Sequence, residues 1–280
     1  MNKNIVIFTG QTATGKTELA VEYAKANNGE IICMDSMQIY ESMPILSAAP
    51  LDKEKQGIQH HLFEFVLPLE NFSVARYEKL AKEKINDIIL RGKLPILVGG
   101  TGLYMNSLLY VDLSAVPYNA TIREELELKT NQELFEILQK IGGLSKVHIN
   151  DRKRLIRAIE IYRITGKTKT EIDKRNRQPS EYNAKIYARK IERSELYDRI
   201  NLRTKEILDN GAIEEVKNLL ELGVKSSNTA SGAIGFKEIK AYQLGETDYD
   251  ECLEKFRQST RNYAKRQETW FKANREIIYI

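Results

Sequence analysis

The chain has 280 residues, of which 42% are hydrophobic and 29% charged, and a formal net charge of +4. This composition is that of a soluble globular protein, and the length favours one α/β domain with a smaller inserted part over two equal domains. Cys33 and Cys252 lie far apart, which argues against a disulfide framework and a CxxC metal site. Because we find no export signal and no apolar run long enough to span a bilayer, we expect a cytosolic protein that does not bind membranes.

The first motif is a phosphate-binding loop. Residues 5–8 form a short apolar run, typical of a strand buried on both faces. After it, Gly10, four residues and then Gly15-Lys16-Thr17 match G-x-x-x-x-G-K-[ST] ahead of a helical segment. Backbone N–H groups, the helix N-terminus and the lysine of such a loop bind phosphate oxygens, and the threonine hydroxyl can ligate Mg²⁺. The motif predicts a diphosphate or triphosphate ligand without identifying a nucleotide. The predicted diphosphate-binding residues are Gly10, Thr12, Ala13, Thr14, Gly15, Lys16 and Thr17.

Two further predicted strands end in polar residues. Residues 29–35 read as a buried strand that brings Asp35 to its carboxyl end, where ligands lie in open parallel sheets. Asp35 could also be a magnesium-holding NTPase carboxylate or a helix cap. A third strand, residues 93–98, ends in a glycine turn that places Thr101 near the P-loop. Residues 42–72 predict mostly loop, in which His60 and His61 make local hydrogen bonds or contact substrate rather than bind a metal.

Charge is distributed unevenly along the chain. Between Lys146 and Lys205 there are 18 Lys and Arg against 8 Asp and Glu, a local charge of +10, so the remainder sums to −6. A solvated helical face is one interpretation. Ten of these 18 residues are arginines, however, and arginine suits bidentate phosphate contacts. The final helix, about residues 250–274, interleaves cations with aromatic residues as nucleic-acid-binding helices do, although we expect Trp270 and Phe271 to pack in the core.

From about residue 117 the alternation of strands and helices gives way to helices alone. The sequence therefore predicts an α/β fold, with a P-loop NTPase-like parallel sheet flanked by helices and an inserted all-helical module. The expected ranges are 1–115 and 185–280 for the catalytic core and 116–184 for the insertion. Residues 185–192 predict a strand returning to the sheet, followed by helices over 194–222 with a break at Gly211.

Seven blocks of the sequence, in order and with matching spacing, resemble the bacterial tRNA dimethylallyltransferases. They are GQTATGKT at 10–17, DSMQIY at 35–40, LVGGTGLYMNSLL at 97–109, NDRKRLIRAIEIYRITGK at 150–167, LYDRINLR at 196–203, GAIGFKEI at 232–239 and RNYAKRQETWF at 261–271. The resemblance implies transfer of a dimethylallyl group from dimethylallyl diphosphate to the exocyclic amine of the adenosine 3′-adjacent to the anticodon, with Mg²⁺ and by a monomer. Two departures stand out. Gln11 replaces the usual proline, and the chain ends soon after the last block.

The reaction gives each candidate residue a role. An adenine amine needs a carboxylate to accept its proton, and Asp35 fits. The P-loop, Lys16 and Mg²⁺ on Thr17 would stabilise charge on the departing diphosphate. By resemblance, Arg203 also converges on the diphosphate and Thr101 lies at its bridging oxygen. The target base must leave its stack to reach this site. By resemblance, the tRNA-contacting residues are Asp35, Ser36, Met37, Gln38, Thr101, Arg123, Lys153, Arg154, Leu155, Ile156, Arg157, Gly235, Phe236, Lys237, Lys265, Arg266 and Gln267, with the helical insertion on the anticodon stem.

Three alternatives remain open from the sequence. A P-loop kinase or other NTPase would need a nucleotide-base site and a strand ending in a metal-binding carboxylate, which the strand before Asp35 could supply. An isopentenyltransferase acting on free adenine nucleotides would share the loop and the base, but it has no use for a segment of charge +10. A non-catalytic RNA-binding protein would not require Lys16, Thr17 and Asp35 together.

Overall fold

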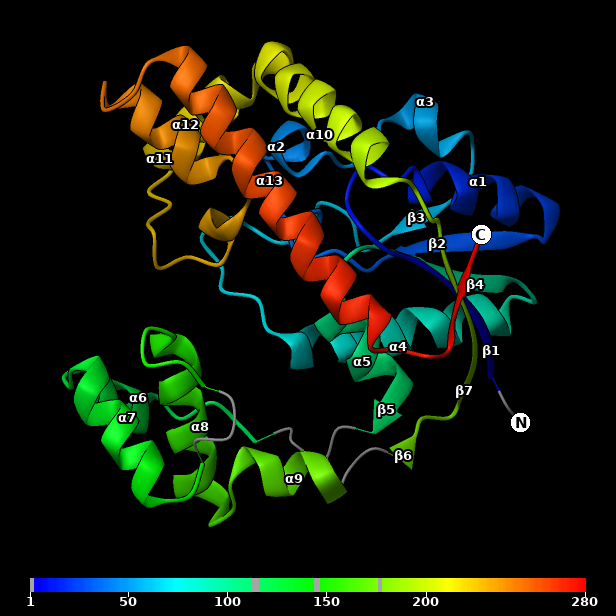
Figure 1. The fold of residues 1–280 in the computed structure, drawn as a ribbon. Coiled ribbons are helices and arrows are strands. Elements are labelled where there is room, and N and C mark those ends of the chain that lie inside the picture. The colour runs from blue at the N-terminus through cyan, green and yellow to red at the C-terminus, as the bar shows by residue number, and fades with distance from the viewer. Residues whose placement is uncertain (1–2, 112–115, 144–146, 176–177) are drawn as a thin grey trace. The chain divides into compact units, whose positions relative to one another are not determined.

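The computed structural model describes residues 3–111, 116–143, 147–175 and 178–280. The chain divides into two compact units, Met1–Leu108 with Glu181–Ile280, and Leu109–Ser180 (Figure 1). The division falls a few residues from the boundaries expected from the sequence. Lys146 and Arg177 of the basic segment, and the expected boundary at residue 115, lie outside the described residues.

The larger unit is built on a six-stranded parallel sheet. Its strands are β1 (Lys3–Thr9), β2 (Gly29–Cys33), β3 (His60–His61), β4 (Leu94–Val98), β7 (Tyr182–Ala188) and β8 (Ile277–Tyr279). They lie in the order β3-β2-β4-β1-β7-β8, and each pairing between neighbours is parallel. The apolar interiors of β1, β2 and β4 explain their central position, because such strands can be covered on both faces. The predicted α/β fold is confirmed.

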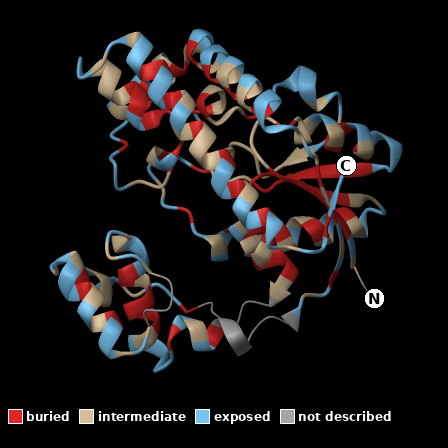
Figure 2. Ribbon diagram, viewed as in Figure 1, coloured by how far each residue is buried: buried red, intermediate tan, exposed pale blue. Residues whose placement is uncertain are grey.

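The central strands are largely buried (Figure 2), and their side chains alternate between the two faces of the sheet. On one face, Val6 and Phe8 pack with Ile31, Ile96 and the apolar side of the helix α1 (Lys16–Ala26). Ile5 and its alternate Ile7 point the other way and are equally buried. Each fully buried aliphatic side chain contributes about 1.5–3 kcal/mol, so the sheet is a rigid support for the loops at its ends.

Helices pack around this sheet, and α10 and α13 run side by side (Figure 1). The helices are α1 (Lys16–Ala26), α2 (Pro44–Ser47), α3 (Asp52–Lys55), α4 (Val74–Leu90), α5 (Gly102–Leu109, which ends at the unit boundary), α10 (Arg193–Ile207), α11 (Ile213–Glu221), α12 (Phe236–Gln243) and α13 (Tyr249–Lys272), with a 3₁₀ turn at Ala230–Gly232. Between α10 and α11 a π-helical turn, Leu208–Ala212, contains Gly211 at φ 110°. That left-handed residue accounts for the helix break predicted there.

The smaller unit is mainly helical. Its helices are α6 (Ala120–Glu127), α7 (Asn131–Lys140), α8 (Arg152–Thr165) and α9 (Lys169–Arg175). Leucines from α6, α7 and α8, including Leu126, Leu134 and Leu155, form its core. Its two short strands, β5 (Tyr110–Val111) and β6 (Gln178–Pro179), pair antiparallel. The inserted unit is therefore not purely helical, whereas an all-helical insertion was predicted. Two-residue strands carry no periodicity that a sequence pattern could reveal.

Residues 42–72 are also more regular than predicted, because His60 and His61 form β3 beside Ile31 and Ile32 of β2. His61 Nε2 lies 2.7 Å from Glu30 Oε2, and His60 Nδ1 lies 2.8 Å from the carbonyl oxygen of Ile58. The Glu30 carboxylate is buried, and hydrogen bonds from Arg91, together with those from Lys93 and His61, hold its pKa well below the usual range. Both histidines thus make the local hydrogen bonds that were expected of them.

Candidate active site

The P-loop connects β1 to α1 and turns its backbone through left-handed conformations. Gly10, Ala13 and Gly15 have φ of 124°, 63° and 78°. Ala13 pays a steric penalty there that glycine avoids, and such strain is concentrated at functional sites. The Gln11 carbonyl closes the loop by accepting hydrogen bonds from Lys16 Nζ at 3.0 Å and from Thr14 Oγ1 at 2.9 Å. The loop is therefore held in an anion-binding shape by its own side chains.

A cavity of about 1180 Å³ opens above this loop. Thr12, Ala13, Gly15, Lys16 and Thr17 line it, as predicted for diphosphate-binding residues. Thr14 is buried behind the lining with its hydroxyl on the Gln11 carbonyl, and Gly10 is buried at the end of β1. These two residues shape the loop instead of facing the cavity. The Thr12 N–H, expected to face the diphosphate, donates to Gln267 Oε1 at 2.7 Å instead.

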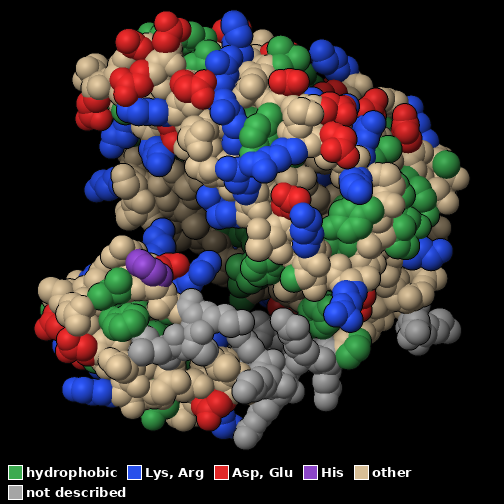
Figure 3. Space-filling view, viewed as in Figure 1, with side chains coloured by type: hydrophobic (Ala, Val, Ile, Leu, Met, Phe, Trp, Pro, Cys, Tyr) green, Lys and Arg blue, Asp and Glu red, His purple; other side chains and the backbone are tan. Residues whose placement is uncertain are grey.

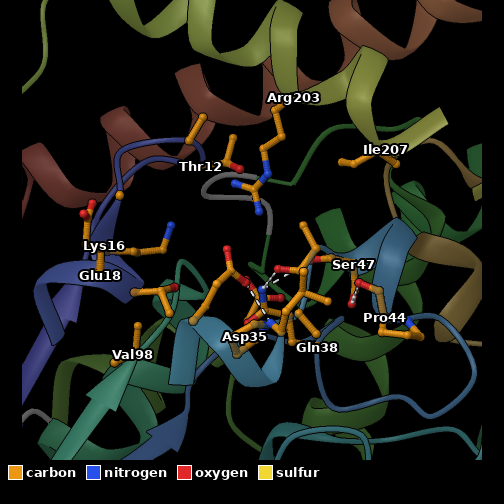
Figure 4. A pocket seen from close by; sticks show the side chains of 18 of the residues that line it. Thr12, Lys16, Glu18, Asp35, Gln38, Pro44, Ser47, Val98, Arg203 and Ile207 are labelled. Atoms are coloured by element: carbon orange, nitrogen blue, oxygen red, sulfur yellow. Dashed lines mark hydrogen bonds between the residues drawn. The ribbon is translucent and has the colours of Figure 1, made fainter. Parts of the chain in front are cut away.

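Three charged side chains point into the same space from different elements. Figure 4 shows the ends of Lys16, Asp35 and Arg203 converging from α1, the loop after β2 and α10. Burial, and next the nearby Arg203 guanidinium, lower the pKa of Lys16 to about 8, while the Asp35 charge opposes this shift. Burial also lowers the pKa of Arg203, again against the effect of Asp35. Two cations close together form a site that favours a polyanionic ligand.

The turn after β2 is tied to the turn after β4, because these strands are neighbours in the sheet. Thr101 Oγ1 accepts a hydrogen bond from the Ser36 N–H at 3.0 Å and donates to Ser36 Oγ at 3.3 Å. Asp35 Oδ1 accepts from the Met37 N–H at 2.9 Å, which fixes the carboxylate. The structure thus brings the Asp35 and Thr101 turns together.

Gln38 is held on the far side of this turn. Its Nε2 donates to the carbonyl oxygens of Ser47 at 3.3 Å and Ala48 at 2.8 Å (Figure 4). Ser47 ends α2 and Ala48 follows it, and this helix is anchored in turn by Glu215, whose two oxygens accept from the N–H groups of Ile45 and Leu46 at 2.8 Å each. Glu215 acts on the site from α11, and sequence reasoning missed it because no motif marks it.

A second cavity of about 210 Å³ adjoins the first and shares Asp35 and Arg203 with it. Met37, Arg266 and the Gly232–Ile234 turn line this second space. Tyr263 borders both cavities, and burial raises the pKa of its phenol well above the usual value. Sequence reasoning missed Tyr263 as a site residue, because it is one of several aromatic residues interleaved with cations in the final helix.

Several residues expected to touch RNA cannot do so through their side chains. Leu155 and Ile156 lie in the core of the smaller unit, and Phe236 is buried beneath the Gly232–Gly235 turn. The prediction is wrong for these three side chains, because apolar residues inside a basic block pack inward at helical spacing. Gly235 itself has φ 99° and starts α12.

Two arginines of the smaller unit are committed to a buried partner. Glu160 is fully buried, and its oxygens accept from Arg123 Nε and Nη2 at 3.0 and 2.9 Å and from Arg157 Nη1 at 2.6 Å. Arg157 Nη2 also donates to the Val116 carbonyl at 2.7 Å. The Arg154 side chain, by contrast, is 73% exposed and pairs with the neighbouring Asp151 carboxylate at 3.2 Å. Part of the charge in the basic segment is therefore neutralised internally.

In the larger unit, Lys and Arg side chains gather along the face formed by α10 and α13 (Figure 3). Lys265 and Arg266 are exposed on α13, and Lys237 is exposed at the start of α12. Phe271 is buried as expected, whereas Trp270 is 44% exposed, so the prediction of a core position is wrong for Trp270. Its indole lies against Gly102, which has no side chain to displace it.

Comparison with known proteins identifies the family. A family model described as IPP transferase matches residues 38–274. The chain belongs to the IPP transferase family. The tRNA dimethylallyltransferase of Anoxybacillus flavithermus is 45% identical, with 97% of this chain and 88% of that protein covered. The tRNA dimethylallyltransferase of Acetivibrio thermocellus is 43% identical, with 99% and 91% covered.

Solved structures of IPP transferases agree. A full-length tRNA isopentenylpyrophosphate transferase from Bacillus halodurans matches with a TM-score of 0.75 and 37% identity, covering 99% of this chain and 89% of that one. A eukaryotic dimethylallyltransferase acting on tRNA matches with a TM-score of 0.85 and 28% identity, covering 99% and 73%. The family resemblance read from the sequence is confirmed. The chain is thus a prenyl-transferring enzyme, which sets aside the kinase and the non-catalytic RNA-binding protein. In the described part of the chain, no helix combines the length and apolar character needed to cross a bilayer.

Proposed function

We propose that this IPP transferase moves a dimethylallyl group from dimethylallyl diphosphate to N6 of the adenosine 3′-adjacent to the anticodon in tRNA. The observation that supports this most directly is the convergence of Asp35 with Lys16 and Arg203 in one P-loop cavity. The two cations can stabilise the negative charge of a departing diphosphate, and the carboxylate beside them can accept the proton of an attacking amine. The names of the relatives point to the same reaction.

The leaving group determines what the P-loop does. When the bond between the allylic carbon and the bridging oxygen breaks, its electron pair goes to the diphosphate. Lys16, Arg203 and the backbone around Gly15 face the cavity where that charge would develop. Because they are already oriented, they stabilise the charge without reorganising during the reaction. The P-loop would thus hold a departing diphosphate and would not transfer a phosphoryl group.

The nucleophile needs a base. The N6 lone pair is delocalised into the adenine ring, so the new N6–carbon bond forms more readily if the N6 proton passes to a carboxylate. Asp35 is held by the Met37 N–H and is open to both cavities. Thr101 is fixed beside it through Ser36. The smaller cavity, which shares Asp35 with the larger one, is the space we assign to the flipped base.

The donor set also fits a magnesium ion. Thr17 faces the larger cavity and offers a hard oxygen donor. Among the described residues no group of three His, Cys, Asp or Glu side chains gathers to hold a metal. This suits Mg²⁺, which takes one or two protein ligands together with water and substrate phosphates. When bound, the ion would add positive charge to the diphosphate.

For tRNA binding, each unit offers exposed cations. In the larger unit these are Lys237, Lys265 and Arg266, and in the smaller unit Lys153 and Arg154. Contacts of this kind act on the RNA backbone and bring the anticodon loop to the enzyme without reading sequence.

The function is tested by incubating the enzyme with Mg²⁺, labelled dimethylallyl diphosphate, and unmodified tRNA, AMP or ATP in separate reactions. We expect label only in tRNA, on the adenosine next to the anticodon, with release of pyrophosphate. Label in AMP or ATP would favour an enzyme acting on free nucleotides. Release of inorganic phosphate from ATP would favour an NTPase.

The role of Asp35 is tested with Asp35→Asn, which keeps the shape but cannot take a proton. Loss of a general base lowers the chemical step by about 10² to 10⁴-fold. We expect that loss in single-turnover transfer, with binding of tRNA and donor little changed. If Asp35 instead served chiefly to anchor magnesium, raising the magnesium concentration would restore much of the rate. Such a rescue would refute the assignment.

A further inference from the structure

One face of α13 runs along the active site and contacts two of its loops. The residues on this face are spaced by three positions, at 264, 267 and 270. The carbonyl of Ala264 accepts a hydrogen bond from Gln11 Nε2 at 3.2 Å. The indole of Trp270 lies against Gly102 at the start of α5. Gln267, between them, contacts both the P-loop and the Thr101 turn.

The Gln267 amide uses both of its ends. Its Oε1 accepts from the Thr12 N–H at 2.7 Å, and its Nε2 donates to the Gly100 carbonyl at 3.0 Å. The side chain is only 5% exposed. Gly100 has no room for a Cβ, because Gln267 Nε2 occupies that position. A buried amide that is bonded at both ends in this way resists rotation, since turning it would leave two backbone groups without partners.

From these contacts we propose that Gln267 is a positioning residue that sets the distance between the P-loop and the Thr101 turn. It fixes Thr12 on one side and Gly100, next to Thr101, on the other. Gln11 supports it by tethering the P-loop to the same helix. This assignment differs from the RNA contact that the family resemblance suggests for Gln267, because the amide is buried and its oxygen and nitrogen already bond the Thr12 N–H and the Gly100 carbonyl.

The inference rests on the proposed function, because that function defines the two groups to be positioned, the diphosphate leaving group and the attacking amine. The P-loop holds the leaving group, and the Thr101 turn is bound to the Asp35 turn through Ser36. Gln267 therefore spans the leaving-group side and the nucleophile side of the reaction. In-line displacement requires the donor carbon and the nucleophile to be held at near-attack distance. A misplacement of about 1 Å can lower the rate about 10²-fold.

The test uses Gln267→Met, which keeps the length of the side chain and removes both hydrogen bonds. Gln258→Leu is the matched control, because Gln258 is exposed on the same helix and its side chain bonds Asn262 one turn further along that helix. At saturating tRNA and donor, we expect single-turnover transfer by Gln267→Met to fall about 10²-fold. The dissociation constant for tRNA and its salt dependence should stay at the wild-type values. Gln258→Leu should leave the rate unchanged.

Two outcomes would overturn the inference. If Gln267→Met binds tRNA more weakly but keeps the wild-type rate at saturation, Gln267 is an RNA contact. If neither the rate nor tRNA binding changes, Gln267 is neither an RNA contact nor a positioning residue. Gln11→Ala provides a second variant that leaves the helix packing intact, and we expect a smaller loss, about tenfold, without weaker tRNA binding. An unchanged rate in this variant would remove Gln11 from the proposal.

A readout that does not need transfer separates this inference from the proposed function. Hydrogen exchange at the Thr12 amide should be slow in the wild type and at least tenfold faster in Gln267→Met, with exchange in β1 unchanged. Affinity for inorganic pyrophosphate should fall in the same variant. If the wild type transfers no dimethylallyl group to tRNA, the proposed function is wrong. If Gln267→Met leaves the Thr12 amide exchange and the pyrophosphate affinity unchanged, the positioning role is wrong.

Discussion

Lys16 makes the binding of the donor depend on pH in a range that can be measured. Its pKa in the free enzyme is lowered to about 8, chiefly by burial and then by Arg203. A diphosphate beside Lys16 favours the protonated form, so its pKa must be higher in the complex. Above pH 8 the free enzyme loses this proton while the complex keeps it. The affinity for dimethylallyl diphosphate should therefore fall as the pH rises, approaching tenfold per pH unit.

The same shift predicts the sign of a stability effect. Because the pKa of Lys16 is lower in the folded chain than its ordinary value of 10.5, folding disfavours the charged form. The cost is fully present below about pH 8 and disappears as the pH rises to about 10.5. Lys16→Met should thus be more stable than the wild type at pH 7, by about 1–3 kcal/mol after allowance for partial exposure to solvent. The two proteins should converge in stability near pH 10.5.

Calorimetric titration of dimethylallyl diphosphate between pH 7 and pH 10, without tRNA, measures the first effect. Lys16→Arg is the control, because arginine stays charged throughout this range and leaves titration of the ligand itself in place. The ratio of the wild-type to the Lys16→Arg affinity should fall above pH 8. A constant ratio would show that Lys16 does not titrate in this range or does not face the diphosphate, and either result would refute the reasoning.

The remaining predictions separate binding from stability. Arg154→Ala should weaken tRNA binding and reduce its salt slope by about one in a filter-binding titration, without lowering the melting temperature, because this side chain is exposed. Arg157→Ala should destabilise the chain by about 1–3 kcal/mol in urea unfolding, since it removes a partner of the buried Glu160; an unchanged midpoint would contradict this. Glu215→Gln should slow single-turnover transfer with tRNA affinity unchanged. One amide oxygen cannot accept from both the Ile45 and the Leu46 N–H groups, so α2, which positions Gln38, would be held less firmly. A wild-type rate would remove Glu215 from the site.

The central strands and the ends that carry function could be predicted from the sequence for a physical reason. β1, β2 and β4 are apolar throughout their interiors, and the residues that follow them lie at one edge of a parallel sheet. Lys16, Asp35 and Thr101 could therefore be assigned to one site without coordinates. Arg203 could not, because it lies on a helix with no periodic signal for the cavity, and only the family resemblance pointed to it.

Contacts between residues distant in sequence were not predictable. Glu160 is a charged residue in a charged helix, and nothing local shows that it is buried under Arg123 and Arg157. The consequence of Gln11 was open as well. Its side chain reaches the Ala264 carbonyl 253 positions away, so the residue that departs from the family pattern forms a contact that proline could not make. A pattern of residue types along the chain records propensity and periodicity, whereas these contacts depend on which helices the fold brings together.

The electrostatics of the site also determine how the Asp35 test must be performed. The charge of Asp35 raises the pKa of Lys16, so Asp35→Asn should lower that pKa further below about 8. At neutral pH the variant would then lose rate for two reasons, the missing base and a less charged Lys16. Below about pH 7 the second reason is reduced, because Lys16 stays largely protonated in both proteins. If Asp35 is the base, the rate should still be about 10² to 10⁴-fold lower than in the wild type at this pH. A deficit that disappears as the pH falls would mean that Asp35 works mainly by keeping Lys16 charged, and the proton would then have to leave the amine by another route.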